Sequence, residues 1–175
     1  MGLGKLDRNF VNIQNCTTEQ IYSWTNLVSF PDNGDKELEL LQNDNSIFEL
    51  LVSDSGAIIG GYSAHIIVGY QIFFLRQIKI NPKLKSEKYI QEIIDRIVTV
   101  GMNTYDENFK GIATLSYFEK DKKKKIESIL MDFGGYIIFK GAKVQDKFAR
   151  CVYMPTNGGY QRDEIKEVFK IIIQL

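Results

Sequence analysis

A basic stretch between two regular segments carries the residue types best suited to binding an anion. It consists of Lys85, Ser86, Glu87 and Lys88, and it follows an apolar run that ends in Ile78, Lys79 and Ile80. A strand that leads through a loop to a helix start presents free backbone N–H groups and the positive end of the helix dipole to its ligand. The stretch therefore predicts an anion site, although a solvated helix start with Ser86 as an ordinary N-cap explains the same residues.

One side chain is a candidate for proton transfer. His65 is the only histidine of the chain, and its ordinary pKa suits a general base near neutrality. A lone histidine on a strand is also commonly a structural hydrogen-bonding residue, so both interpretations stay open. Between Asp54 and Glu87 the sequence has no carboxylate, so no acidic base is available there.

Composition limits the class of protein. The 175 residues are 44% apolar and 25% charged, as expected for one globular domain. Basic and acidic residues number 22 each, so no net charge favours nucleic acid or membrane as a partner. Cys16 and Cys151 lack metal-ligand spacing, so neither a metal site nor a disulfide framework is expected. Without a signal-peptide core or a membrane-length apolar run, we expect a cytoplasmic protein.

Hydrophobic periodicity predicts an α+β, or mixed α/β, domain with a central sheet. Strands are expected at 9–14, 47–53, 57–68, 71–80, 111–118, 136–139 and 148–154. Helices are expected at 18–28, 36–42, 86–103, 121–133 and 163–175. The strand 71–80 is the most apolar and should be central, and with the next helix and strand it should form a right-handed crossover. Gly60 and Gly61 predict a bulge or a close backbone approach.

This order of elements resembles the GNAT family of acyl-CoA-dependent N-acyltransferases. The resemblance covers residues 9–154 and leaves 161–175 as an appended C-terminal helix of a single domain. It implies a mostly antiparallel, twisted sheet flanked by helices, acetyl-CoA or another acyl-CoA as donor, and an amine as acceptor. It further implies that Ile78, Lys79 and Ile80 pair with the pantetheine arm and that the basic stretch 85–88 holds the phosphates. His65 or ordered water would take the amine proton, and Tyr117 would assist the leaving thiolate as general acid. The chain has nine tyrosines, several of which must serve packing, so a packing role for Tyr117 stays open.

The sequence departs from the family pattern at four positions. Aligned on Pro82, the family's Arg/Gln-x-x-Gly-x-Gly/Ala signature falls on 85–90, where Lys85 replaces the Arg/Gln. Both small positions are lost, to Lys88 and Ile90, although glycine there lets the backbone approach phosphate closely. Met131 occupies the position of a tyrosine that the family uses as an acid, while the following Gly135-Tyr136 pair fits. These losses leave a second hypothesis open, a non-catalytic interaction or ligand-binding module on the same scaffold.

Two further stretches have an interpretation as interaction surfaces. The last segment, from Asp163 to Leu175, places Ile165, Val168, Phe169, Ile172 and Leu175 on one helical face. Because the family core is complete without this helix, we expect its stripe to contact a second copy or another protein. Lys122 to Lys125 could contact nucleic acid, but acidic neighbours cancel much of their charge, so a solvated helix start is the favoured interpretation.

Overall fold

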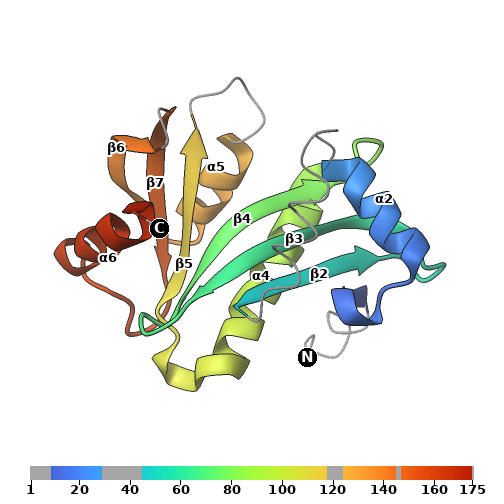
Figure 1. Ribbon diagram of the computed structural model, residues 1–175, viewed down its shortest axis with the longest axis horizontal. Helices are drawn as coiled ribbons and strands as arrows, with labels where there is room; N and C mark the ends of the chain where they lie inside the picture. The colour runs from blue at the N-terminus through green and yellow to red at the C-terminus, as the bar shows by residue number, and fades with distance from the viewer. Residues whose placement is uncertain (1–8, 29–44, 118–123, 145–146, 175) are drawn as a thin grey trace. The chain divides into compact units, whose positions relative to one another are not determined.

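The computed structural model describes residues 9–28, 45–117, 124–144 and 147–174 (Figure 1). The strands are β1 (Phe10–Asn12), β2 (Ser46–Val52), β3 (Ile58–Ile67), β4 (Ile72–Ile80), β5 (Gly111–Tyr117), β6 (Tyr136–Val144) and β7 (Lys147–Pro155). The helices are α2 (Thr18–Val28), α4 (Ser86–Tyr105), α5 (Lys124–Asp132) and α6 (Arg162–Gln174), with short 3-10 helices η2 (Ile13–Asn15) and η3 (Asp106–Asn108). The expected helix at 36–42 lies outside the described residues, as do Lys122 and Lys123.

The strands form a seven-stranded sheet in the order β1-β2-β3-β4-β5-β7-β6, which confirms the predicted α+β class and the central place of β4. Strand β4 pairs with β5 in parallel, from Ile72 opposite Gly111 to Leu75 opposite Thr114. The β1–β2, β2–β3, β5–β7 and β6–β7 pairs are antiparallel. The connection from β4 through α4 to β5 is therefore the parallel crossover that the sequence predicts. No described helix is long and apolar enough to cross a membrane.

Two strand boundaries differ from prediction for local reasons. Strand β1 ends at Asn12, because the Asn12 side chain accepts a hydrogen bond from the Gln14 backbone N–H (3.0 Å) and caps η2. Asparagine competes in this way with a strand ladder, which a two-residue periodicity cannot reveal. Strand β6 continues to Val144, well past the predicted residue 139. Irregular pairing near Phe139 breaks its alternation, so the periodic pattern stopped too early.

The described residues form two compact units. The first lies within Met1–His65 and Arg76–Ile97, and the second lies within Ile66–Leu75 and Val98–Leu175. The single domain expected from the sequence stays a prediction.

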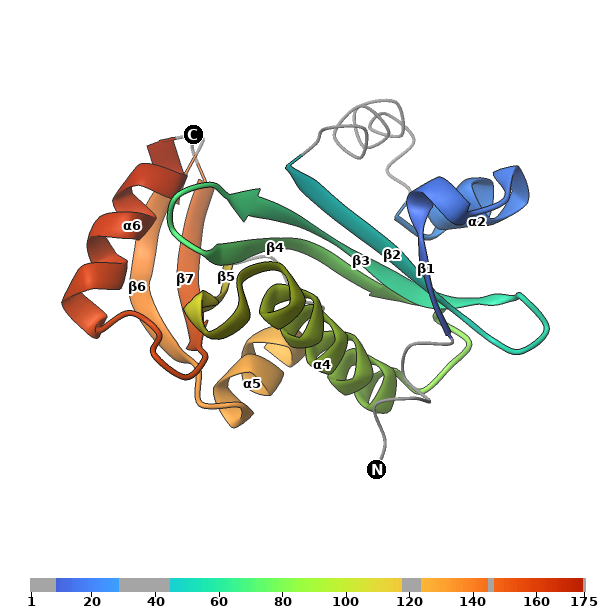
Figure 2. The same ribbon diagram turned by 90° about the horizontal axis from the view of Figure 1, so that it is seen from below.

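In the first unit, α2 and α4 cover opposite faces of the sheet (Figure 2). Trp24 of α2 is fully buried, and its ring centroid lies 5.0 Å from that of Phe48 on β2. Leu50, two residues further along β2, belongs to the same apolar cluster. Glu49, between Phe48 and Leu50, points to the other face and is hydrogen-bonded by Arg96 of α4.

In the second unit, the apolar stripe of α6 is buried against its own sheet. Ile165, Val168, Phe169 and Ile172 join one core cluster with Cys151 and Tyr153 of β7. The segment before α6 is also tied down, since the Tyr160 backbone N–H donates to the Tyr153 hydroxyl (2.9 Å) and the Tyr160 hydroxyl to the Tyr70 carbonyl (2.7 Å). The described part of the stripe on α6 therefore packs within the chain, and a contact with a second copy or another protein through α6 stays a prediction.

Gly60 and Gly61 lie at a β-bulge and at a close backbone approach, the two alternatives predicted for them. The β2–β3 register shifts between Leu51, opposite Gly60, and Val52, opposite Ile58, which leaves an extra residue on β3. A Cβ on Gly60 would lie 2.4 Å from the Lys79 carbonyl oxygen, and a Cβ on Gly61 would lie 2.8 Å from the Trp24 ring. Glycine is required here because β3 passes within a side chain's width of the end of β4.

We predict that Gly60→Ala separates β3 from β4 and lowers the free energy of unfolding by about 1–3 kcal/mol, as overpacking does. Urea denaturation would measure the loss. Gly141→Ala on β6 is the matched control, because nothing lies within 4 Å of its added Cβ. Equal stability of the two variants would contradict the close approach.

Candidate active site

Hydrogen bonds determine the backbone path at the end of β4 and in the turn after it. Ile78 is buried, and Lys79 and Ile80 are half-buried. The strand ends where the Asn81 N–H donates to the Ile59 carbonyl (2.8 Å). The Asn81 side-chain oxygen then accepts a hydrogen bond from the Lys83 backbone N–H (3.1 Å). The Asn81 backbone carbonyl accepts one from the Leu84 N–H (2.9 Å). These bonds turn the chain at Pro82 and lead it directly to the start of α4.

The loop before α4 and the first turn of the helix are basic and open to solvent. The helix begins at Ser86, whose side chain lies outside what the structure describes, and Lys83, Lys85, Glu87 and Lys88 are exposed. Lysines near a helix N-terminus oppose its dipole, so an anion bound there would relieve unfavourable electrostatics. Only Glu87 in this turn has the charge that the dipole favours. The arrangement can bind a phosphate-bearing ligand through backbone N–H groups and ammonium groups together.

The two positions that lost small residues have different environments. Ile90 is 6% exposed and belongs to the buried stripe of α4, which also contains Ile93, Ile94 and Ile97. Lys88 points into solvent, with its side chain 79% exposed, and its Nζ lies 3.9 Å from a Glu92 carboxylate oxygen. An exposed pair at that distance contributes little, so the Lys88 ammonium is able to turn towards an anion. The bulk at position 90 fills the core, and the bulk at position 88 lies in water.

His65 lies on β3 directly opposite Ser46 of β2. The Ser46 Oγ and the His65 Nδ1 are 3.1 Å apart. Burial and the nearby Arg76 guanidinium lower the pKa of His65, against a smaller opposing effect of a hydrogen bond to the Asn45 backbone. The imidazole is therefore neutral at pH 7, which is the form that can accept a proton.

The first unit thus contains His65, the strand end 78–80 and the basic stretch 85–88, whereas Tyr117 belongs to the second unit. Tyr117 is the last residue of β5, where it pairs with Ala149 of β7. Its side chain lies outside what the structure describes, so its role as an acid stays a prediction. Met131 is exposed near the end of α5, which stops before Gly134 at a positive φ of 89°, as expected for a glycine C-cap.

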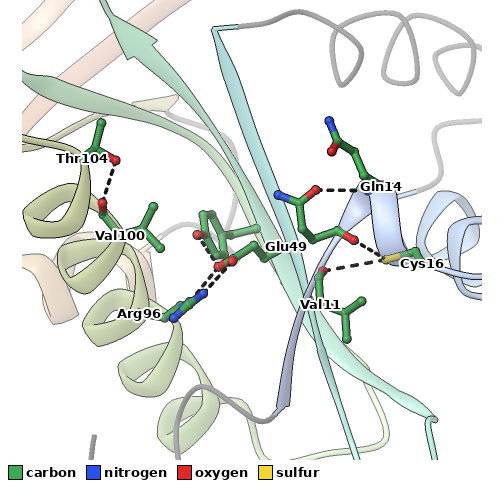
Figure 3. A network of polar contacts seen from close by, with 9 residues as sticks. Val11, Gln14, Cys16, Glu49, Arg96, Val100 and Thr104 are labelled. Carbon is green, nitrogen blue, oxygen red and sulfur yellow. Dashed lines mark hydrogen bonds and ion pairs between the residues drawn. The ribbon is translucent and has the colours of Figure 1, made fainter.

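A buried polar network in the first unit was not predicted from the sequence (Figure 3). Arg96 of α4 donates from Nε (2.9 Å) and from a terminal nitrogen (2.8 Å) to the two carboxylate oxygens of Glu49. The Tyr62 hydroxyl of β3 donates to the same carboxylate (2.7 Å), and the Arg96 guanidinium lies over the Phe10 ring. Burial and Glu49 hold the pKa of Tyr62 well above its usual range. Through these contacts the network connects α4 with β1, β2 and β3.

A signal for this network was present in the sequence. Glu49 interrupts the apolar run IFELLV, and Arg96 lies among the isoleucines of the stripe on α4. Charged residues are rarely buried unless they are paired. Two opposite charges in two buried segments therefore indicate partners, although no local pattern shows which charges meet.

Comparisons with known proteins place this geometry in a class. No family profile and no curated protein matches the sequence. The structure of an aminoglycoside 6'-acetyltransferase type Ii is similar, with a TM-score of 0.68, 11% identity and coverage of 83% of this chain and 96% of that one. An aminoglycoside 6'-N-acetyltransferase from Enterococcus faecium follows, with a TM-score of 0.65, 10% identity and the same coverage. A spermidine N-acetyltransferase from Vibrio cholerae in complex with CoA and spermine has a TM-score of 0.63, 11% identity and coverage of 85% and 96%.

These three structures are acetyltransferases of the GNAT fold, and the matched region includes most of this chain. The chain therefore has the GNAT fold, which confirms the resemblance seen in the order of its elements. At 10–12% identity the likeness shows the fold and leaves the chemistry to the residues of this chain.

Proposed function

We propose that this protein is an acyl-CoA-dependent N-acyltransferase that transfers an acetyl or other acyl group to an amine. The observation that carries the proposal is the set of three exposed lysines, Lys83, Lys85 and Lys88, in the loop after β4 and the first turn of α4, on a fold shared with solved N-acetyltransferases. Those relatives act on aminoglycosides or spermidine, as their names state. An amine is likewise the proposed acceptor of this protein.

In this proposal the donor is held by backbone and by lysines. The backbone of Ile78, Lys79 and Ile80 pairs with the pantetheine arm. The N–H groups of the segment 85–88 bind the pyrophosphate, and Lys85 and Lys88 supply positive charge in place of the close contact that glycine would allow.

The transfer itself proceeds by direct attack. The amine nitrogen attacks the thioester carbonyl, an amide C–N bond forms, and the C–S bond breaks. Neutral His65 or ordered water takes the amine proton, and the departing CoA thiolate takes a proton from water. Cys151 is disfavoured as a nucleophile, because it is fully buried and burial raises its pKa to about 12.

We predict that acetyl-CoA and CoA raise the melting temperature, because a ligand that binds the folded state stabilises it by mass action. Lys85→Glu should weaken acetyl-CoA binding at least about tenfold, equivalent to about 1.4 kcal/mol. Reversing this charge removes an attraction and adds a repulsion next to the phosphates. Isothermal titration calorimetry would measure the affinity.

Lys140→Glu is the matched control, because it makes the same charge change at an exposed position of β6 in the second unit. It should bind acetyl-CoA like the unchanged protein. Absence of any thermal shift at millimolar acetyl-CoA would contradict the proposed donor. An equal loss of affinity in both variants would contradict the placement of the phosphates at α4.

A second function is supported by a specific observation. The family's acid tyrosine is replaced by Met131, which is exposed on α5 and has no acidic proton. A binding module that has lost catalysis would retain acyl-CoA affinity without turnover. Incubation with acetyl-CoA and a panel of primary amines, with detection of free CoA thiol, distinguishes the two functions.

A further inference from the structure

The connection between β7 and α6 is a strap of six residues, Thr156 to Gln161, that forms neither helix nor strand. Its first residue is bonded to the segment that leads into β5. The Thr156 hydroxyl donates to the Phe109 carbonyl, and the Thr156 N–H donates to the Lys110 carbonyl (3.3 Å). A Cβ on Gly159 would lie 2.8 Å from that Lys110 carbonyl oxygen, so the strap lies directly against Lys110.

Lys110 joins the strap to two other segments of the second unit. Its backbone N–H donates to the Gln71 carbonyl (2.8 Å), in the turn between β3 and β4. Its carbonyl also accepts from the Tyr153 hydroxyl of β7. Its Nζ donates to the Gly158 carbonyl in the middle of the strap (2.8 Å) and lies 5.9 Å from the centroid of the Tyr160 ring. Lys110 therefore holds the strap through its backbone and through its ammonium group.

The ammonium contact with the strap is a strong one for its kind. A hydrogen bond from a charged donor is roughly twice as strong as a neutral one, and the face of an aromatic ring attracts the same charge. Lys110 is half-buried, so solvent screens these contacts less than it screens those of a fully exposed lysine.

We propose that the Lys110 ammonium is a latch that keeps the strap closed, and that the strap and α6 open as one unit when the latch is released. The strap ends where α6 begins, and Tyr160 near its end makes two further bonds, to the Tyr153 hydroxyl and to the Tyr70 carbonyl. Opening the strap breaks these bonds together and leaves α6 held by its apolar stripe. The latch thereby controls how often that stripe separates from its own sheet, and this role is independent of the proposed acyltransferase function.

Native-state hydrogen exchange of the full chain, followed amide by amide with NMR, measures such an opening. Lys110→Met keeps the length of the side chain and removes the ammonium. The amides of Tyr160 and α6 should then exchange at least about tenfold faster, the usual effect of losing a hydrogen bond to a charged group. The amides of β2, in the first unit, should keep their rates. Lys110→Arg retains the charge and should retain most of the protection.

Lys166→Met is the matched control, because it removes an ammonium from α6 itself, where the pair with the exposed Asp163 carboxylate spans 3.8 Å. It should leave the exchange of α6 unchanged. Unchanged exchange of α6 in Lys110→Met would overturn the latch, and equal acceleration of β2 and α6 would show that α6 does not open as a separate unit. A measurement on the unchanged protein at low urea tests the unit without any variant. The amides of Tyr160 and α6 should share one opening free energy below that of β2, and exchange of α6 through global unfolding alone contradicts the proposal.

Discussion

Replacing Glu49 with alanine should lower the free energy of unfolding by about 3–5 kcal/mol, the cost of breaking a buried charge pair. The Glu49 and Arg96 side chains are 8% and 17% exposed, and both carboxylate oxygens accept from the guanidinium. The substitution leaves the Arg96 charge and the Tyr62 hydroxyl without their shared partner in a buried place. Urea denaturation followed by circular dichroism would measure the change.

The control is an ion pair that is exposed to solvent. Lys170 and Glu167 on α6 are only 2.6 Å apart, but their side chains are 57% and 70% exposed. Glu167→Ala should therefore cost no more than about 1 kcal/mol, because solvent screens the pair. Similar losses for Glu49→Ala and Glu167→Ala would show that the buried network does not act as a unit.

A triple variant separates charge from packing. Glu49→Leu with Arg96→Met and Tyr62→Phe removes every polar group of the network and keeps most of its volume. It should lose less stability than Glu49→Ala, because no uncompensated charge remains in the core. A greater loss in the triple variant would contradict the electrostatic explanation.

Phe169→Ala should likewise cost about 3–5 kcal/mol, the usual effect of removing a fully buried phenyl ring. Phe169 is inaccessible to solvent and lies in one cluster with Ile165 and Ile172 of its own helix and with Cys151 and Tyr153 of β7. A cavity there loosens α6 from the sheet of the second unit. Thermal and urea unfolding would measure the loss, with Ile171→Ala, at a residue 41% exposed, as the control of less than about 1 kcal/mol.

The same pair of variants tests the partner surface expected from the sequence. If α6 belongs to the core, Phe169→Ala destabilises the protein, and light scattering gives an unchanged mass for the folded population. An unchanged stability together with a reduced mass would show instead that the stripe on α6 is an intermolecular contact.

The sequence contained two kinds of readable information about the fold. Alternating and helical periodicities located the strands and the helices of the described residues, because burial of one face is a local requirement on residue spacing. Turn residues then set the ends of elements, as at Asn81-Pro82 after β4 and at Gly134 after α5. Such order was sufficient to predict the GNAT fold, which the solved structures confirm.

The sequence was least informative where a feature depended on residues distant along the chain. The stripe on α6 looked unoccupied, because an amphipathic pattern says that a face is buried without saying against what. Strand β6 was read too short, since irregular pairing interrupts the alternation by which a strand is recognised.

For the basic stretch 85–88, the sequence by itself determined the charge and the position at a helix start. Only the tertiary structure decided that Ile90 is buried in the core while Lys88 lies in solvent. It also decided that His65 on β3 lies opposite Ser46 on the adjacent strand β2. The physical reason is that composition and spacing act along the chain, whereas burial and hydrogen bonding depend on residues that folding brings together. Glu49 and Arg96, separated by 47 positions, meet only in that way.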